Sequence, residues 1–192
     1  MYHHSSSVRV VVQDRTDVLC GKSRPGHFDG VATVLTKLFN IVLPTKAYFG
    51  IKDAQQVAVV EGLISDLNFP IELIAVDIVR EEDGLAKSSR NVNLLPEERR
   101  QAAVIYKSLI AAKVAIVGGE RDPQVVKSLV SAMITSESEG QIDYVEVYSY
   151  PQLKALEELD GTCIIAAAVK FSRVRLIDNI ILEVSQEIGG VE

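Results

Sequence analysis

Two short polar stretches contain the residues of this sequence that could do chemistry. The first is Gly50-Ile51-Lys52-Asp53, with Gln56 one turn later, and the second is Lys87-Ser88-Ser89-Arg90. An arginine forks onto phosphate oxygens, a lysine adds a mobile point charge, and two hydroxyl groups between them supply further donors. Gly50 would let a ligand approach the backbone closely, and Asp53 could accept hydrogen bonds from ribose hydroxyls. Together these residue types predict a site for a phosphorylated nucleoside.

Each stretch also has a simpler interpretation. Asp53 in a first helical turn more often stabilises the helix dipole than binds a nucleotide, and Gln56 more often belongs to a solvated helix face. The stretch 87–90 could be an exposed loop before a helix, since Pro96 and the two glutamates after it suit a first helical turn. For the second stretch both interpretations can hold, because the cap and the phosphate clamp use different residues.

The surrounding elements predict that both stretches leave one edge of a parallel sheet. A strand at 46–50 is followed by a helix over 52–69 and a strand at 71–79, whose near-continuous aliphatic content suits burial on both faces. Strand, helix and strand with short connections predict a right-handed βαβ unit, in which ligands bind beyond the carboxyl ends of the strands. Gly50 ends the first strand, and the loop with residues 87–90 follows the second.

The amino-terminal part predicts a further strand and helix. The β-branched run 8–13 is typical of a strand, and apolar spacing over 28–42 predicts a helix. Arg24 and His27 would then lie at the junction between a turn and that helix. The His3–His4 pair could hold a metal, but tandem histidines beside three serines more often have no ligand role, so we expect no metal site.

The organisation changes after residue 95. We expect a long helix over 96–119 ended by two glycines, a helix from Pro123 to about Glu137, and strands at 142–150, 162–171 and 174–184 in a small antiparallel sheet. The fold class is therefore α/β, with two domains at 1–94 and 95–192. The second domain is an α+β module that we expect to close over the nucleotide as a lid.

Composition excludes several function classes. The chain has 192 residues, is 47% hydrophobic and carries a net charge of -6, with no block of like charges, which argues against a general nucleic-acid surface. No apolar run reaches the roughly 18 residues of a spanning helix, so we expect a cytoplasmic protein without a membrane segment. Cys20 and Cys163 lie far apart and outside any C-x-x-C pattern, so neither a disulfide framework nor a zinc site is expected.

Four segments, in order, resemble the pantothenate synthetase family, the AMP-forming pantoate:β-alanine ligases. They are RPGHFDGV, YFGIKDAQQ, DGLAKSSRN and RLIDNIILEV, and the resemblance runs from about residue 8 to residue 184. It implies a Rossmann-like nucleotidyltransferase domain, here its carboxyl-terminal part, followed by the lid. It also implies a homodimer that uses ATP with Mg²⁺ and condenses pantoate with β-alanine through pantoyl adenylate.

The resemblance also implies a role for each matching residue. The expected ATP-binding residues are Gly50, Ile51, Lys52, Asp53, Val79, Lys87, Ser88, Ser89 and Arg90. Among them Lys52, Ser88, Ser89 and Arg90 would be catalytic, and Val79 would contact adenine through its backbone. Gln56 would bind pantoate, with Arg24 and His27 lining the pantoate and β-alanine side. Lys87 occupies a position where the family usually has methionine. This difference adds a cation to the phosphate clamp.

A larger departure concerns the H-x-G-H signature of the family. This sequence contains no H-x-G-H, and the resemblance covers the part of the family that follows it. We therefore expect the chain to expose a sheet edge and apolar surface. Two alternatives stay open: a nucleotide-binding and lid fragment without catalysis, or another adenylate-forming nucleotidyltransferase. Arg24, His27 and Gln56 argue against the second, because they match the acid-substrate pocket.

The 192 residues by themselves should form little or no pantothenate. Each preorganised donor that is lost from an adenylation site typically costs on the order of 100- to 1000-fold in rate. A steady-state assay of the purified chain checks this, with a separately made H-x-G-H segment added as the complementing sample. Pantothenate formation at the rate of a complete synthetase, without the added segment, would contradict the expectation.

Overall fold

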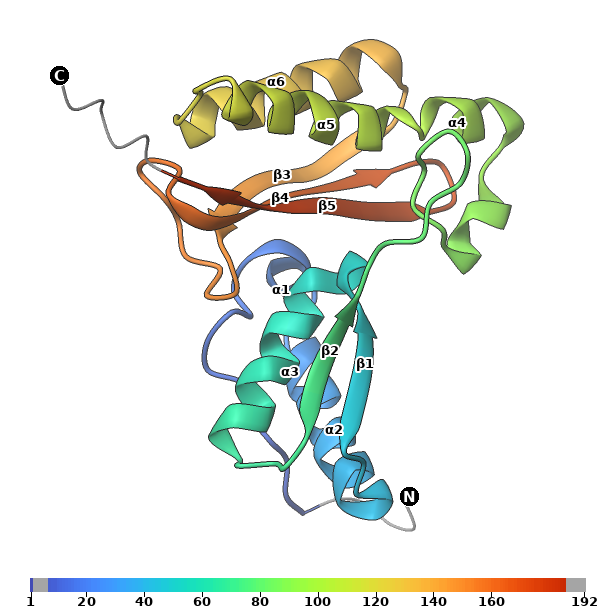
Figure 1. Ribbon diagram of the computed structural model, residues 1–192. Coiled ribbons are helices and arrows are strands. Elements are labelled where there is room, and N and C mark those ends of the chain that lie inside the picture. Colours follow the sequence, from blue (N-terminus) through green and yellow to red (C-terminus); the bar gives the residue numbers. More distant parts are fainter. Residues whose placement is uncertain (2–6, 186–192) are drawn as a thin grey trace, which may run out of the picture. The chain divides into compact units, whose positions relative to one another are not determined.

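The computed structural model describes Met1 and residues 7–185, so the His3–His4 pair lies outside the described residues (Figure 1). The chain divides into two compact units, Met1–Asp77 and Ile78–Glu192, and each is described here by itself. This division falls earlier than residues 91 to 95. The assignment of functional domains to 1–94 and 95–192 stays a prediction.

The first unit contains the predicted βαβ arrangement. Its elements are α1 (Leu19–Ser23), α2 (His27–Val42), β1 (Lys46–Gly50), the 3-10 turn η1 (Ile51–Asp53), α3 (Ala54–Asp66) and β2 (Glu72–Val76). Strands β1 and β2 pair in parallel, from Lys46 opposite Glu72 to Gly50 opposite Val76. The two strands therefore end together at one edge, as the sequence predicts.

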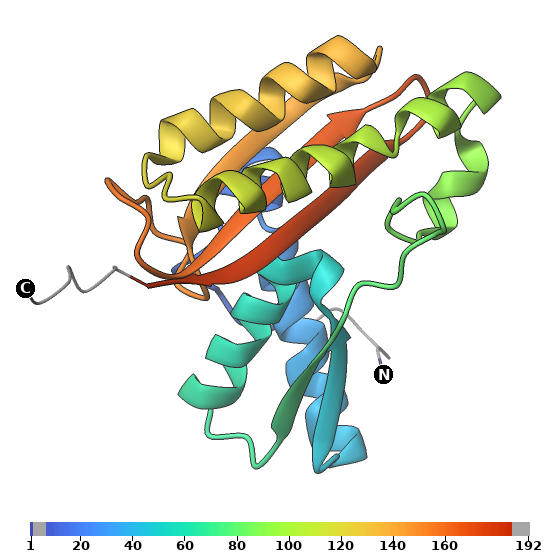
Figure 2. The ribbon, with the colours of Figure 1, turned by 45° about the horizontal axis from the view of Figure 1, so that its top comes forward.

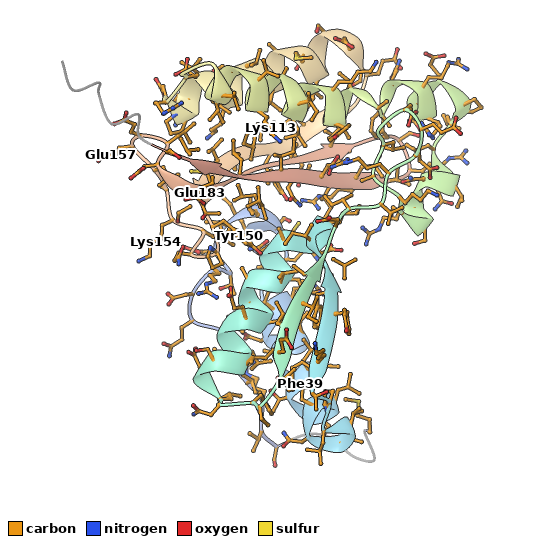
Figure 3. The ribbon with its side chains drawn as sticks, viewed as in Figure 1. Phe39, Lys113, Tyr150, Lys154, Glu157 and Glu183 are labelled. Carbon is orange, nitrogen blue, oxygen red and sulfur yellow. The ribbon has the colours of Figure 1, made fainter. Side chains whose placement is uncertain are left out.

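Helices α2 and α3 pack with the strands around a small apolar core. Phe39 of α2, labelled in Figure 3, is buried with Val60 and Leu63 of α3 and Ala47 of β1. Its ring meets that of Phe69 edge to face, with 5.5 Å between the centroids. Aromatic pairs of this geometry add to the stabilisation from buried apolar area. The core thus joins both helices to β1.

The predicted strand at 8–13 is wrong. This segment forms no strand, and its backbone is instead held by side chains of α2. The Val10 amide donates to Thr33 Oγ1 and the Val12 amide donates to Asp29 Oδ1, each at 2.9 Å. β-branched residues favour strands, but a strand also needs a neighbouring strand, and here hydroxyl and carboxylate acceptors of α2 take its place.

The second strand is shorter and more exposed than predicted. It ends at Val76 rather than residue 79, and Val76 and Val79 are 43% and 62% exposed. Burial on both faces is therefore wrong for this strand. The expected apolar surface is present in the same unit: Ile41, Val42 and Tyr48 are all more than half exposed. Aliphatic content alone could not distinguish a strand covered on both sides from one that is not.

The second unit is an antiparallel sheet with two long helices. Its elements are the 3-10 turn η2 (Ser89–Asn93), α4 (Pro96–Gln101), α5 (Val104–Val117), α6 (Pro123–Glu137), β3 (Gln141–Ser149), β4 (Gly161–Lys170) and β5 (Arg175–Val184). The strand order is β3-β4-β5. Figures 1 and 2 both show α5 and α6 side by side over one face of this sheet. The predicted antiparallel sheet is confirmed.

The core of this unit lies between the two helices and β4. Ile105 and Leu109 of α5, Val130 of α6, and Ile165 and Val169 of β4 are almost completely buried in one cluster. Strand β4 is the middle strand, which explains why its residues are buried almost continuously. No helix in the described part of the chain is long and apolar enough to cross a membrane.

The long helix predicted over 96–119 is interrupted. Helix α4 ends at Gln101 and α5 begins at Val104. At this break the Ile105 amide donates a hydrogen bond to the Ala102 carbonyl at 3.2 Å, which makes a tighter turn. Ala102 and Ala103 are both buried. Alanine favours a helix, so nothing in the local sequence marks this break. The end of the helix was predicted correctly, because Gly118 caps α5.

One carboxylate joins all three strands. Asp143 of β3 pairs with Lys170 of β4 and accepts a hydrogen bond from Arg175 Nε of β5 at 2.9 Å. The ammonium of Lys170, and then the guanidinium of Arg175, lower the pKa of Asp143 against the opposing effect of burial. The carboxylate therefore stabilises the fold in its charged form.

Asp143→Asn should lower the free energy of unfolding at neutral pH by about 1–3 kcal/mol, because two cations lose a charged acceptor. The folded-state pKa is below the unfolded-state value of about 4, so this contribution is complete above pH 4 and is lost as the pH falls through the folded-state pKa. Urea unfolding at neutral and at acidic pH measures the difference.

The matched control is Asp160→Asn, whose side chain is exposed. It should leave the unfolding free energy almost unchanged at both pH values. If the deficit of Asp143→Asn were equally large at acidic pH, the charged pair would not be its cause.

Candidate functional site

The carboxyl end of β1 carries the first predicted stretch. Gly50 ends the strand with extended backbone, Ile51–Asp53 form the turn η1, and α3 begins at Ala54. Neither the backbone of Gly50, at φ -67°, nor its packing requires glycine, because a Cβ there would meet nothing within 4 Å. Asp53 occupies the position before α3, but its side chain makes no capping hydrogen bond. Simple capping therefore does not account for Asp53.

The predicted segment that contains His27 lies near the first predicted stretch, to which Asp53 belongs. Burial and then the Arg24 guanidinium lower the pKa of His27, whereas the Asp53 carboxylate opposes them. The imidazole is therefore neutral at neutral pH and offers one donor and one acceptor. Asp53, which is 26 positions from His27 in the sequence, therefore acts electrostatically on His27 within the first unit, as does the nearby Arg24.

Gln55 and Gln56, although adjacent, have different environments. Gln55 is 5% exposed, and its Nε2 donates to the carbonyl oxygens of Arg15 and Val18 at 2.7 and 2.8 Å. Its Oε1 accepts the Gly21 amide at 3.2 Å, so it holds the segment that leads to Arg24. Gln56 is only partly buried. A side chain of this kind is available to a ligand, whereas that of Gln55 is not.

Sequence reasoning missed Gln55, although a signal was present. It lies three and four residues before Ala58 and Val59, which are buried on α3. This spacing places Gln55 on the apolar face of the helix, where a polar side chain must find hydrogen-bond partners.

A cavity of about 430 Å³ lies beside this segment, entirely within the first unit. Lys22 and Arg24 contribute positive charge to its lining, and Asp17 and Asp29 contribute negative charge. Of the predicted site residues in this unit, the cavity reaches Arg24 but not Gln56 or His27. It therefore coincides with only part of the predicted acid-substrate pocket.

In the second unit, residues 79–87 form a closed hairpin, called here the 79–87 hairpin. The Lys87 amide donates to the Val79 carbonyl and the Glu81 amide donates to the Leu85 carbonyl, both at 2.8 Å. Gly84 makes the turn with φ +92°, a conformation that L side chains rarely adopt. Two predicted ATP-binding residues, Val79 and Lys87, are therefore joined directly by a hydrogen bond.

The second predicted stretch continues from this hairpin into a 3-10 turn. Ser88 Oγ accepts the Arg90 amide at 3.2 Å and thereby caps η2. Asn91 Nδ2 donates to the Ala86 carbonyl at 3.1 Å, which closes the stretch from the other side. Accepting one hydrogen bond leaves the Ser88 hydroxyl able to donate. Arg90 is exposed, as a phosphate-binding cation should be.

The alternative interpretation of this region is also present in the structure. Pro96 begins α4, and Glu98 Oε2 accepts the Leu95 amide at 2.9 Å. Because the Leu95 amide donates to it, and because of further hydrogen bonding at Ser172, the pKa of Glu98 is lowered. The cap uses residues 95–98 and none of residues 87–90, so the phosphate-binding interpretation of residues 87–90 stays a prediction beside it.

No cluster of three or more His, Cys, Asp or Glu side chains that could hold a metal occurs in the described part of the chain. The residues grouped in the first unit are instead suited to hydrogen bonding and to a cation contact with an anion. In the second unit, the second predicted stretch offers two hydroxyl groups and two cations beside the 79–87 hairpin. This donor set can bind phosphate oxygens.

Comparison with known proteins identifies the family. A family model for pantoate-beta-alanine ligase matches residues 1–181. A pantothenate synthetase of Geobacillus sp. (strain WCH70) is 66% identical over 184 residues, which are 96% of this chain and 65% of that relative. The chain therefore spans just under two thirds of that relative's length.

Solved structures agree with the sequence comparison. Pantothenate synthetase from Thermus thermophilus matches with a TM-score of 0.89 and 40% identity, over 97% of this chain and 67% of that one. Pantoate-beta-alanine ligase from Francisella tularensis, complexed with beta-gamma ATP and beta-alanine, matches with a TM-score of 0.64 and 28% identity, over 91% and 58%. Since both kinds of match span nearly all of this chain, it belongs to the pantoate-beta-alanine ligase family.

Proposed function

We propose that this chain acts in the ATP-dependent condensation of pantoate with β-alanine. The observation that carries the proposal is the match to the ligase family along residues 1–181. The proposed reaction has two steps. The pantoate carboxylate attacks the α-phosphorus of ATP, which gives pantoyl adenylate and releases pyrophosphate. The β-alanine amine then attacks the acyl carbon and displaces AMP.

In this proposal, each predicted ATP-binding residue has the role that the family resemblance implies. Lys52 contacts phosphate, and Gly50 and Asp53 contact the ribose. The unstrained backbone of Gly50 supports this assignment, because close approach of a ligand gives a reason for glycine where packing gives none. Val79 contacts adenine through its backbone. Lys87, Ser88, Ser89 and Arg90 surround the triphosphate and stabilise the charge that develops in adenylation.

Gln56, Arg24 and His27 are proposed to bind the acid substrates. Arg24 can pair with a carboxylate, and the partly buried Gln56 can donate to one. The lowered pKa of His27, caused first by burial, keeps its imidazole neutral, so it adds no charge to the pocket. The neutral ring can accept a hydrogen bond from the amine of β-alanine.

Magnesium enters this proposal only with the nucleotide. Mg²⁺ commonly binds through substrate phosphates and water with one or two carboxylates, so it needs no complete set of protein ligands. The described residues offer no such set. When bound, the ion would neutralise phosphate charge, while Lys52 and Arg90 orient the phosphate oxygens.

The remaining proposals concern assembly and location. We place the functional domains at 1–94 and 95–192, with the second acting as a lid. We also propose a homodimer, which the family resemblance implies, and the cytoplasm, where ATP and small biosynthetic acids occur. The exposed apolar side chains of α2, Ile41 and Val42 among them, support the existence of a further protein contact.

The double variant Lys52→Ala/Arg90→Ala should weaken ATP binding. Each cation that loses its phosphate contact is expected to raise the Kd of ATP by about tenfold or more. Calorimetric titration of the 192-residue chain with ATP and magnesium measures this, and the two single variants separate the contributions.

The matched control is Lys46→Ala/Arg100→Ala. Lys46 lies at the other end of β1, where it pairs with Glu72, and Arg100 is exposed on α4. The control removes the same two residue types and should retain the original Kd. Equal weakening by both double variants would indicate a general charge effect. Absence of ATP binding by the unsubstituted chain would contradict the proposed function of these 192 residues.

Gln56→Ala should weaken pantoate binding about tenfold without lowering stability, because the side chain is proposed to donate to the ligand and is only partly buried. Gln55→Ala, one residue away, should instead lower the melting temperature, because three backbone groups lose their partner. Pantoate titration and thermal unfolding of both variants check this. The assignment of Gln56 fails if its variant binds pantoate normally.

A further inference from the structure

One buried ion pair fastens the 79–87 hairpin to β5. The guanidinium of Arg80 donates to both carboxylate oxygens of Asp178, at 2.6 Å from Nη1 to Oδ2 and 3.0 Å from Nη2 to Oδ1. The side chain of Asp178 is 4% exposed and that of Arg80 is 18% exposed. A two-point contact between planar groups fixes orientation as well as distance. The hairpin is therefore held against the sheet in one geometry.

Arg80 also joins the tip of the hairpin to α5. Its Nη1 donates to the Gly84 carbonyl at 3.0 Å, and its guanidinium carbon lies 3.6 Å from the centroid of the Tyr106 ring. A Cβ on Gly84 would lie only 2.4 Å from Tyr106 Cδ1, so the turn rests directly on that ring. One guanidinium thus contacts the hairpin tip, α5 and β5 at once.

A second ion pair of the hairpin is weaker. Asp83 pairs with Arg99 of α4, but both side chains are about one third exposed or more. Exposed pairs of this kind contribute little, because water screens them and ordering two long side chains costs entropy. Of the two ion pairs, Arg80–Asp178 therefore contributes more to the position of the hairpin, beside the apolar contact of Leu85, which is buried in the core cluster.

Asp178 lies in the segment RLIDNIILEV, to which the proposed reaction assigns no role. Its carboxylate is bound by protein groups, since Oδ1 also accepts the Asn179 amide at 2.8 Å. A buried carboxylate with these partners acts through Arg80 rather than by touching a substrate. It is a positioning residue and not a catalytic one.

We propose that the Arg80–Asp178 pair positions Val79 and residues 87–90 for ATP. The inference rests on the proposed function, because it takes these residues as nucleotide contacts. Val79 and Lys87 are the two ends of the hairpin that Arg80 holds, so a shift of the hairpin moves both. Donors on a loop bind phosphate well only when the surrounding structure holds them in place before the ligand arrives.

The test compares Asp178→Asn with the unsubstituted chain in two measurements. Hydrogen exchange of the Lys87 and Glu81 amides should become roughly tenfold faster, because the hairpin opens more often. The Kd of ATP should rise on the order of tenfold to a hundredfold, as expected for misplaced contacts. Arg80→Lys keeps the positive charge but loses the fork, and it should change both measurements in the same direction.

The control is Asp143→Asn, which makes the same chemical change in another ion pair to β5, one that includes no residue of the 79–87 hairpin. It lowers stability but should leave hairpin exchange and ATP affinity unchanged. Equal hairpin exchange in Asp178→Asn and this control would overturn the inference. Faster exchange with an unchanged Kd would overturn its functional part.

The two proposals fail in distinguishable ways. If the unsubstituted chain binds no ATP, the proposed function fails, while hydrogen exchange still decides whether Arg80 and Asp178 hold the hairpin. If Asp178→Asn does not fold, Arg80→Lys provides both measurements, because Arg80 is the more exposed member of the pair.

Discussion

The parallel pairing of β1 with β2 is the constraint on which the first unit depends. Parallel strands need a crossover, and α3 supplies it, so both strands end at one edge, with Gly50 opposite Val76. The turn after Gly50 then presents Lys52 and Asp53 at the carboxyl end of the sheet, where ligands of such folds bind. The chemistry assigned to these residues follows from strand direction rather than from their individual propensities.

The first unit also shows how one polar side chain can organise a neighbouring segment. The amide of Gln55 satisfies three backbone polar groups of the segment that leads into α1, at Arg15, Val18 and Gly21. The same role belongs to Thr33 and Asp29 of α2 toward residues 10–12. Helix side chains therefore replace the strand that the β-branched run led us to expect.

The second unit uses buried charge for a similar purpose. Asp143 joins three strands, and Asp178 joins a strand, a hairpin and a helix through one arginine. Ion pairs of this kind are weak evidence for added stability, because desolvation offsets much of their attraction. Their directional contacts are better suited to holding one arrangement among several of similar energy. This distinction is the reason why we propose a positioning role toward ATP for a pair that touches no substrate.

Much of the fold was determined by the sequence itself: the parallel unit, the helix starts at Pro96 and Pro123, the helix end at Gly118 and the three antiparallel strands all follow from periodicity and turn residues. The two polar stretches were likewise visible as local patterns. Only tertiary structure decided the conformation of residues 8–13, the exposure of β2 and the break at Ala102, and it alone showed which backbone groups Gln55 binds. Asp178 and Arg80 are 98 positions apart, so no local pattern could pair them. Local propensity depends on neighbours in sequence, whereas burial and long-range pairing depend on which surfaces meet after folding.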